Sequence, residues 1–260
     1  MSDPFETYLR ERSAADYADF LLPHLNDDSI VLDIGCGEGA IAIGLADLAG
    51  RVVGVDLNDE EFAGARRWAI EHEIGNVEFR VGSVAALDFP DGHFDACLCH
   101  SMLETLDEPL DALGEIKRIL KPGGVVGVAC VEYGGLVLAG PDAELLSRFY
   151  AVREQVWQVE NAADPYRGRQ LRGLLERAGF DRVDATAKYF SYGTAEAVES
   201  FGRARAEDCS DNWYASSAQK HGLATADELA AMRRAWLGWS TAPDAFLAFP
   251  WGRAVGWKPS

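Results

Sequence analysis

A glycine-rich segment near the N-terminus carries the clearest chemical signal in the sequence. It runs from Val31 to Gly39 and reads VLDIGCGEG, an apolar run that leads into three glycines at two-residue intervals. Positions without side chains let a ligand approach the backbone, and a helix that starts after them turns its N-terminus toward that ligand. The segment therefore predicts a small-molecule binding turn between a strand and a helix.

Two carboxylates flank this turn and indicate what it binds. Asp56 ends a second apolar run, RVVGVD, where an acidic residue can accept hydrogen bonds from ribose hydroxyls. Asp33 precedes the first glycine and would hold an ammonium group, whereas it would repel a pyrophosphate. Gly35, Gly37 and Ala40 also match the dinucleotide fingerprint G-x-G-x-x-A. An NAD(P)-dependent oxidoreductase is therefore an alternative, and Asp33 argues against it.

Strands and helices are predicted to alternate around these residues. Apolar or alternating runs predict strands at residues 29–34, 51–56, 76–81, 94–100, 125–131, 182–192 and 246–257. Helical spacing of apolar residues predicts helices at residues 9–25, 40–48, 58–69, 108–120, 141–160, 169–178, 194–206 and 225–239. Short strands that alternate with helices are typical of βαβ units, so the sequence predicts an α/β protein with a parallel sheet.

Four motifs occur in the order VLDIGCGEG, VVGVD, FPDGHFD and LKPGG. Together they resemble the class I S-adenosylmethionine-dependent methyltransferases, in particular bacterial small-molecule enzymes similar to the ubiquinone/menaquinone C-methyltransferases. The resemblance implies a Rossmann-like, doubly wound sheet of seven strands, mostly parallel with an antiparallel last strand. It implies one methyltransferase domain over residues 1–260, with a cofactor-binding core at 29–131. Residues 133–168 and 193–245 would be helical insertions that form a cap over the acceptor site.

The same resemblance implies S-adenosyl-L-methionine as the cofactor. The expected cofactor contacts are Asp33, Gly35, Cys36, Gly37, Asp56, Leu57, Ser83, Val84 and Cys99. Asp33 would orient the amino group, Asp56 would bind the ribose hydroxyls and Leu57 would pack on the adenine. The family has a Gly-Asp pair after its third strand, but this chain has Gly82-Ser83-Val84. The Ser83 hydroxyl and the Val84 N–H are therefore expected to make the adenine contacts.

One histidine is predicted to lie beside the cofactor. His100 follows the fourth predicted strand, at the sheet edge where ligands bind in α/β proteins. Methyl transfer depends mainly on alignment of the acceptor, with a base where a proton must leave. His100 is the candidate catalytic base, and the alternative is a contact residue without a catalytic role.

Aromatic residues are the candidates for acceptor binding. The expected acceptor contacts are Tyr17, Tyr133, Trp157 and Tyr214. They would form an apolar or aromatic pocket, with cation–π contacts if the acceptor is an amine. The alternative is that the rings of the predicted insertions form a second small core.

Composition limits the partners of the chain. Its 260 residues carry 24 basic and 42 acidic side chains, a net charge of −18 that disfavours nucleic acid. No apolar run reaches the length of about 18 residues that predicts a membrane span, so no membrane insertion is expected. Five cysteines, an odd number, fit the reducing cytoplasm, and no metal site is expected.

The predicted function is transfer of a methyl group from S-adenosylmethionine to an O, N or C nucleophile of a small-molecule acceptor. The alternatives are an NAD(P)-dependent oxidoreductase and a non-catalytic S-adenosylmethionine-binding protein. A homodimer is compatible with each of these functions.

Overall fold

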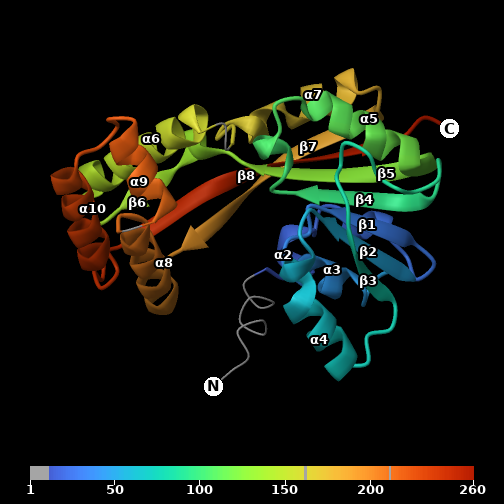
Figure 1. Ribbon diagram of the computed structural model, residues 1–260, viewed down its shortest axis with the longest axis horizontal. Helices are drawn as coiled ribbons and strands as arrows, with labels where there is room; N and C mark the ends of the chain where they lie inside the picture. The colour runs from blue at the N-terminus through green and yellow to red at the C-terminus, as the bar shows by residue number, and fades with distance from the viewer. Residues whose placement is uncertain (1–11, 161–162, 211) are drawn as a thin grey trace. The chain divides into compact units, whose positions relative to one another are not determined.

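A computed structural model describes residues 12–160, 163–210 and 212–260, and these contain an eight-stranded sheet (Figure 1). The strands are β1 (Ile30–Ile34), β2 (Arg51–Asp56), β3 (Val77–Val81), β4 (Phe94–His100), β5 (Leu120–Val131), β6 (Val137–Ala139), β7 (Asp181–Tyr192) and β8 (Phe246–Trp257). Their order is β3-β2-β1-β4-β5-β8-β6, and β7 pairs with β8. The predicted α/β class and the mostly parallel sheet are confirmed.

The first five strands are parallel, which places their carboxyl ends at one edge of the sheet. β1 lies between β2 and β4, and Asp33 is in register with Gly54 on one side and Leu98 on the other. β2 pairs in parallel with β3, and β4 with β5. The apolar residues of β1, β4 and β5 are nearly all buried, as expected for strands covered on both faces. The ends of β1, β2 and β4 therefore bring the glycine turn, Asp56 and His100 to the same edge.

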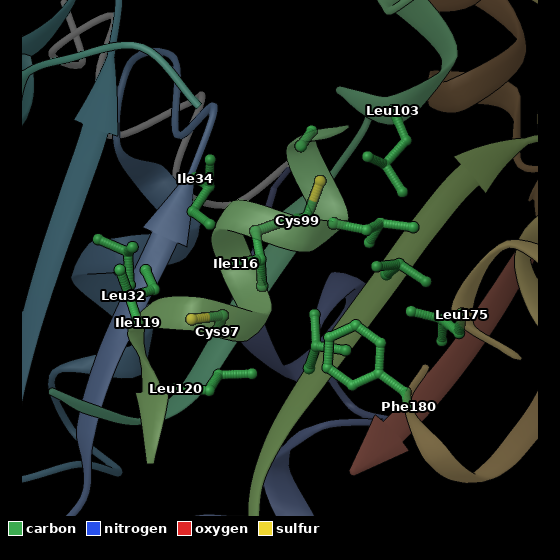
Figure 2. Close-up of a cluster of buried hydrophobic side chains, with 14 of the residues drawn as sticks. Leu32, Ile34, Cys97, Cys99, Leu103, Ile116, Ile119, Leu120, Leu175 and Phe180 are labelled. Atoms are coloured by element: carbon green, nitrogen blue, oxygen red, sulfur yellow. The ribbon is translucent and has the colours of Figure 1, made fainter. Parts of the chain in front are cut away.

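Helices cover both faces of these strands. The α-helices are α2 (Ala14–Tyr17), α3 (Ala40–Leu45), α4 (Ala63–Glu71), α5 (Pro109–Ile119), α6 (Ala143–Val159), α7 (Leu171–Arg177), α8 (Ala195–Asp208), α9 (Trp213–Lys220) and α10 (Ala226–Trp239). One buried cluster joins the strands to α5 and α7, with Ile116 and Leu175 among its members (Figure 2). A second cluster joins them to α2, α3 and α4. Because neighbouring side chains on a strand point to opposite faces, the two clusters make the sheet doubly wound.

Two local predictions are wrong. Part of the helix expected over residues 9–25 lies outside the described residues. The rest is the short α2 followed by a 3-10 turn, Leu22–His24, in which Pro23 lacks the N–H that a continuous helix needs. The helix predicted from residue 58 begins instead as a 3-10 turn at Asp59–Phe62, and α4 starts only after it.

One β-strand and one α-helix were not predicted. The three-residue strand β6 raises the strand number from seven to eight, and it pairs antiparallel with the start of β8 through Leu138 and Leu247. The short helix α9 starts at an Asn212 cap whose side chain accepts a hydrogen bond from Ala215 N.

The chain divides into two compact units. The first unit comprises residues 1–130, 168–186 and 252–260, and the second comprises residues 131–167 and 187–251. The second unit contains α6, α8, α9 and α10, with Trp236 and Trp239 fully buried. Among the described residues, no helix is both long and apolar enough to cross a membrane.

Candidate functional site

The glycine turn after β1 has a backbone that only glycine adopts easily. Gly35, Gly37 and Gly39 have φ angles of 71°, 52° and 84°, all in the left-handed region. A Cβ on Gly35 would lie 2.9 Å from the Met102 side chain, whereas a Cβ on Gly37 would meet no heavy atom within 4 Å. Gly35 is therefore required for packing, and Gly37 leaves open space that a ligand can fill.

The carboxylate of Asp56 is fixed against this turn. One oxygen accepts a hydrogen bond from Gly37 N at 2.8 Å, and the other accepts one from Leu57 N at 2.7 Å. Each carboxylate oxygen has further lone pairs, so two hydroxyls of a ligand can also donate to it. The end of β2 thus presents an oriented acceptor pair next to the open position at Gly37.

Asp33 is a buried carboxylate whose second oxygen is not paired. Its side chain is 2% exposed, and Oδ2 has no hydrogen-bond partner among the described residues. Burial, and secondarily the charge of Asp56, raise the pKa of Asp33 to about 7. A buried charge without a partner is costly, so this carboxylate fits a cationic ligand group.

A cavity of about 160 Å³ opens beside Asp33. Its lining consists of Arg12, Asp33, Gly35, Cys36, Gly37, Ile41, His100 and Ser101. The guanidinium of Arg12 and the carboxylate of Asp33 give it one group of each charge, as a zwitterion requires. Arg12 was not predicted from the sequence, since nothing in its local pattern marks it as a ligand contact.

A second cavity, of about 290 Å³, adjoins Asp56. It is lined by Ile34, Gly35, Val55, Asp56, Leu57, Gly82, Ser83, Val84, Ser101, Met102, Thr105 and Leu106. The structure therefore brings Asp56, Leu57, Ser83 and Val84 together, as the sequence predicted. Met102 and the residues that follow it were missed, because a 3-10 turn rather than a motif carries them there.

His100 lies in the smaller cavity, where the strand order predicted it. Its ring is 6% exposed and makes an edge-to-face contact with Tyr17, with ring centroids 5.2 Å apart. Burial, and secondarily the charge of Arg12, lower the pKa of His100 to about 3. The imidazole is therefore neutral at physiological pH, but a pKa so far below the working pH makes it a weak proton acceptor and a poor match for a general base. Its catalytic role remains a prediction.

The two predicted cysteine contacts lie in different places. Cys36 lines the smaller cavity, and burial, followed by the charge of Asp33, raises the pKa of its thiol. Cys99 is fully buried in the cluster beneath α5, on the opposite face of β4 from His100 (Figure 2). Within the described part of the chain, Cys99 lines neither cavity.

Three of the predicted acceptor residues meet in the second unit. Tyr133 stacks on Trp157 with ring centroids 5.1 Å apart. The Arg153 guanidinium carbon lies 5.3 Å from the Trp157 ring centroid and 5.8 Å from that of Tyr214. The Tyr214 hydroxyl donates to a backbone carbonyl at 3.2 Å, so this ring is packed as a core residue. Tyr17 belongs to the first unit.

Comparisons with known proteins identify the family of this chain. A methyltransferase domain model matches residues 32–128. A probable methyltransferase of Aspergillus luteorubrus is 31% identical over 250 residues, which cover 91% of this chain and 81% of that protein. A ubiquinone/menaquinone biosynthesis C-methyltransferase of a Marinomonas species is 30% identical over 174 residues, covering 59% of this chain and 66% of that protein.

Solved structures share the fold. A putative methyltransferase from Bacillus halodurans superposes with a TM-score of 0.58 at 19% identity, covering 95% of this chain and all of that one.

Asp33, Asp56 and the open position at Gly37 fit S-adenosylmethionine, which carries an ammonium group, a ribose diol and a thin methionine chain. The chain belongs to the class I S-adenosylmethionine-dependent methyltransferases, and its reaction is transfer of a methyl group from that cofactor to a small-molecule acceptor.

Proposed function

We propose that the two cavities of the first unit form one cofactor site, with the smaller one holding the methionine end and the larger one the nucleoside. The buried Asp33 carboxylate, with one oxygen unpaired among the described residues, is the observation that carries this assignment, because Asp33 and Arg12 both line the smaller cavity. Asp33 would take the ammonium group and Arg12 the carboxylate. Asp56 would accept both ribose hydroxyls, and Leu57 would pack on the base.

The bound cofactor supplies a methyl group that is already activated on a sulfonium, so the protein mainly has to orient its partner. The fixed turn around Gly37 and the buried Asp33 hold the methionine end in one position. His100 is a neutral polar group beside that end, with Tyr17 against its edge. We propose that His100 contacts the acceptor or the cofactor and positions it without taking up the proton.

We propose that the acceptor is a small, largely apolar molecule that uses an O, N or C nucleophile. The stacked rings of Tyr133 and Trp157 in the second unit support this choice, since aromatic rings offer flat apolar contact surfaces. The similarity to a quinone-biosynthesis C-methyltransferase is consistent with it. Whether Tyr17 also contacts the acceptor is part of the same proposal.

We propose that the enzyme works in the cytoplasm. The five cysteines are free and buried, which suits the reducing cytoplasm. The net charge of −18 disfavours nucleic acid as an acceptor. We propose that the chain can form a homodimer, and light scattering of the purified protein tests this.

The experiment is a screen of phenols, catechols, amines and active methylene compounds with S-adenosylmethionine, read out as S-adenosylhomocysteine release. We expect release with at least one acceptor class and none with the Asp33→Asn, Asp56→Asn double variant. Wild-type protein that binds the cofactor but releases no product with any acceptor would support a non-catalytic binding protein instead. The exposed Asp47→Asn variant serves as the matched control and should behave as wild type.

A further inference from the structure

One edge of the sheet in the first unit is formed by β3. This strand stands at the end of the strand order, and among the described residues only β2 pairs with it (Figure 1). The outer side of an edge strand carries backbone N–H and C=O groups that can pair with another chain. The edge of β3 is therefore a place where a further strand can be added.

The backbone groups that face outward can be identified from the pairing with β2. Asn76 O and Gly82 N, which flank β3, make hydrogen bonds of 2.8 and 2.9 Å to β2. Successive residues of a strand direct their N–H and C=O groups to opposite sides. Glu78 and Arg80 therefore bond to β2 as well, and residues 77, 79 and 81 direct their N–H and C=O groups to the outer side.

One side chain already contacts this outer side. Phe79 O accepts a hydrogen bond from the Arg66 side chain at 3.0 Å. A backbone carbonyl has two lone pairs, so Phe79 O can accept a second hydrogen bond from another chain. Arg66 also pairs with Asp59 at 2.8 Å, and its guanidinium carbon lies 5.2 Å from the Phe62 ring centroid. It would therefore keep partners of its own if a further strand displaced it from Phe79.

The sequence of β3 is complementary to itself in one antiparallel register. It reads Val77-Glu78-Phe79-Arg80-Val81. With a two-fold axis at Phe79, Glu78 of each copy lies opposite Arg80 of the other, and Val77 lies opposite Val81. A shift of two residues would place Glu78 opposite Glu78 or Arg80 opposite Arg80, and like charges in these positions are destabilising.

The same register uses the outward backbone groups. Residues 77, 79 and 81 would form the hydrogen-bonded pairs of the ladder. Glu78 and Arg80 would fall in the pairs without hydrogen bonds, where the side chains of the two strands lie closer together. Within its own chain Glu78 pairs with Arg80 at 2.8 Å and with Arg51 at 2.9 Å, so the charges are already gathered at this edge.

The surroundings of β3 suit association of two copies. The chain has a net charge of −18, but residues 63–81, which include α4 and β3, carry three basic and three acidic side chains. Ile70 and Val81 are 79% and 57% exposed, two of the three highest values among the large apolar side chains of the described residues. A groove of about 550 Å³ between α4 and β3 is lined by Ile70, Ile74, Val77 and Phe79, among others. This face is thus neutral and partly apolar on an acidic protein.

We propose that two copies of this chain associate through β3, as an antiparallel strand pair with its two-fold axis at Phe79. The inference rests on the homodimer proposed above and assigns a surface to it. β3 has five residues, so the contact is small, and we expect a dissociation constant of about 10–100 μM.

The test reverses one charge at a time and measures the dimer by sedimentation equilibrium. Arg80→Glu places a glutamate opposite Glu78, and Glu78→Arg places an arginine opposite Arg80. Each variant alone should have a dissociation constant raised about tenfold or more. In an equimolar mixture of the two variants every opposite pair is again of unlike charge, so a dimer of one copy of each should form about as readily as the wild-type dimer.

Arg172→Glu on α7 is the matched control, because it reverses an exposed arginine that also pairs with a glutamate. It should leave the dissociation constant unchanged. Circular dichroism and binding of S-adenosylhomocysteine confirm that each variant is folded.

Three results would overturn the proposal. Wild-type chain that is still monomeric at about 1 mM would remove the dimer itself. A wild-type dimer that Arg80→Glu and Glu78→Arg weaken no more than Arg172→Glu does would place the contact elsewhere. A mixture of the two variants that stays monomeric would rule out the register. None of these results bears on methyl transfer, which the acceptor screen tests separately.

Discussion

At the scale of single residues, the site is defined by a carboxylate that the fold buries without pairing. Asp33 is held between β2 and β4 with Oδ2 lacking a partner among the described residues. Such a group destabilises the folded chain, because its ionised form loses hydration. Its position in a cavity beside Arg12 indicates that ligand binding offsets this cost.

Cofactor affinity should therefore depend on the ionisation of Asp33. Because its pKa is raised to about 7, only the ionised fraction can hold the ammonium group. The affinity for S-adenosylhomocysteine should rise about tenfold between pH 6 and pH 8, which calorimetry at several pH values can measure. In Asp33→Asn the affinity should be low and flat over this range. A wild-type affinity independent of pH would contradict the assignment.

The same residue should lower stability at high pH. Its folded pKa of about 7 lies above the ordinary value of 3.8 for an aspartate, so the folded state binds the proton more tightly. Its destabilising effect therefore grows as pH rises from about 4 and is complete above 7. Asp33→Asn should melt at a higher temperature than wild type, and by a larger margin at pH 8 than at pH 5. An equal margin at both pH values would argue against a buried, titrating carboxylate.

Asp56 should contribute both to ligand binding and to the shape of the turn. Asp56→Ala should weaken cofactor binding by about 2–3 kcal/mol, because two hydroxyls lose a charged acceptor. It also removes the hydrogen bonds from Gly37 N and Leu57 N, so the melting temperature should fall. Calorimetry and thermal melts measure the two effects. Unchanged affinity in the variant would mean that the ribose binds elsewhere.

His100 should affect the acceptor more than the rate. A pKa near 3 keeps the ring neutral, so no limb of the kcat–pH profile should fall between pH 5 and 8 through this residue. His100→Ala should raise the acceptor KM and leave kcat within about tenfold of wild type. A loss of kcat of about 100-fold or more, with a lost pH limb, would restore the general base predicted from the sequence.

At the scale of elements, the turn after β1 combines a left-handed backbone at its glycines with open space beside Gly37, where a ligand can bind. Gly37→Val should abolish cofactor binding, since the side chain would occupy that space. Gly222→Val is the matched control, because Gly222 has a φ of 67° and also has no heavy atom within 4 Å of a Cβ. Both variants carry the same backbone strain, so circular dichroism and calorimetry separate folding from binding. Normal binding by Gly37→Val would show that the turn does not hold the cofactor.

Elements with strong patterns could be predicted, and elements set by tertiary contacts could not. β1, β2 and β4 are apolar runs followed by turn residues, so their ends, and with them Asp33 and His100, were placed correctly. β6 has three residues and no alternating pattern, and it exists because β8 lies beside it. The helix predicted over residues 9–25 is not continuous in its described part. Its apolar residues have helical spacing, but Pro23 lacks the N–H that a continuous helix needs.

The same distinction applies to the site. Motifs predicted Gly35, Gly37 and Asp56, since backbone conformation and strand ends are encoded locally. Arg12 reaches the smaller cavity only through tertiary packing, which no local pattern records. Cys99 was expected from the family resemblance to contact the cofactor, and strand alternation turns its side chain into the core.

At the scale of the whole molecule, the proposed cofactor site lies within one unit. Every residue that lines the two cavities belongs to the first unit, which includes residues 1–130. The stacked Tyr133 and Trp157 belong to the second unit. We therefore expect changes at these two rings to alter acceptor KM while leaving cofactor affinity unchanged.

The central claim is that the glycine turn after β1, together with Asp33 and Asp56, binds the methionine and ribose of S-adenosylmethionine. The most direct measurement is calorimetric titration of the wild-type protein with S-adenosylhomocysteine and, separately, with NADH. We predict one S-adenosylhomocysteine bound per chain, with binding weakened in Asp33→Asn, and no heat from NADH, because its pyrophosphate would meet the Asp33 carboxylate. Binding of NADH together with no binding of S-adenosylhomocysteine would contradict the account.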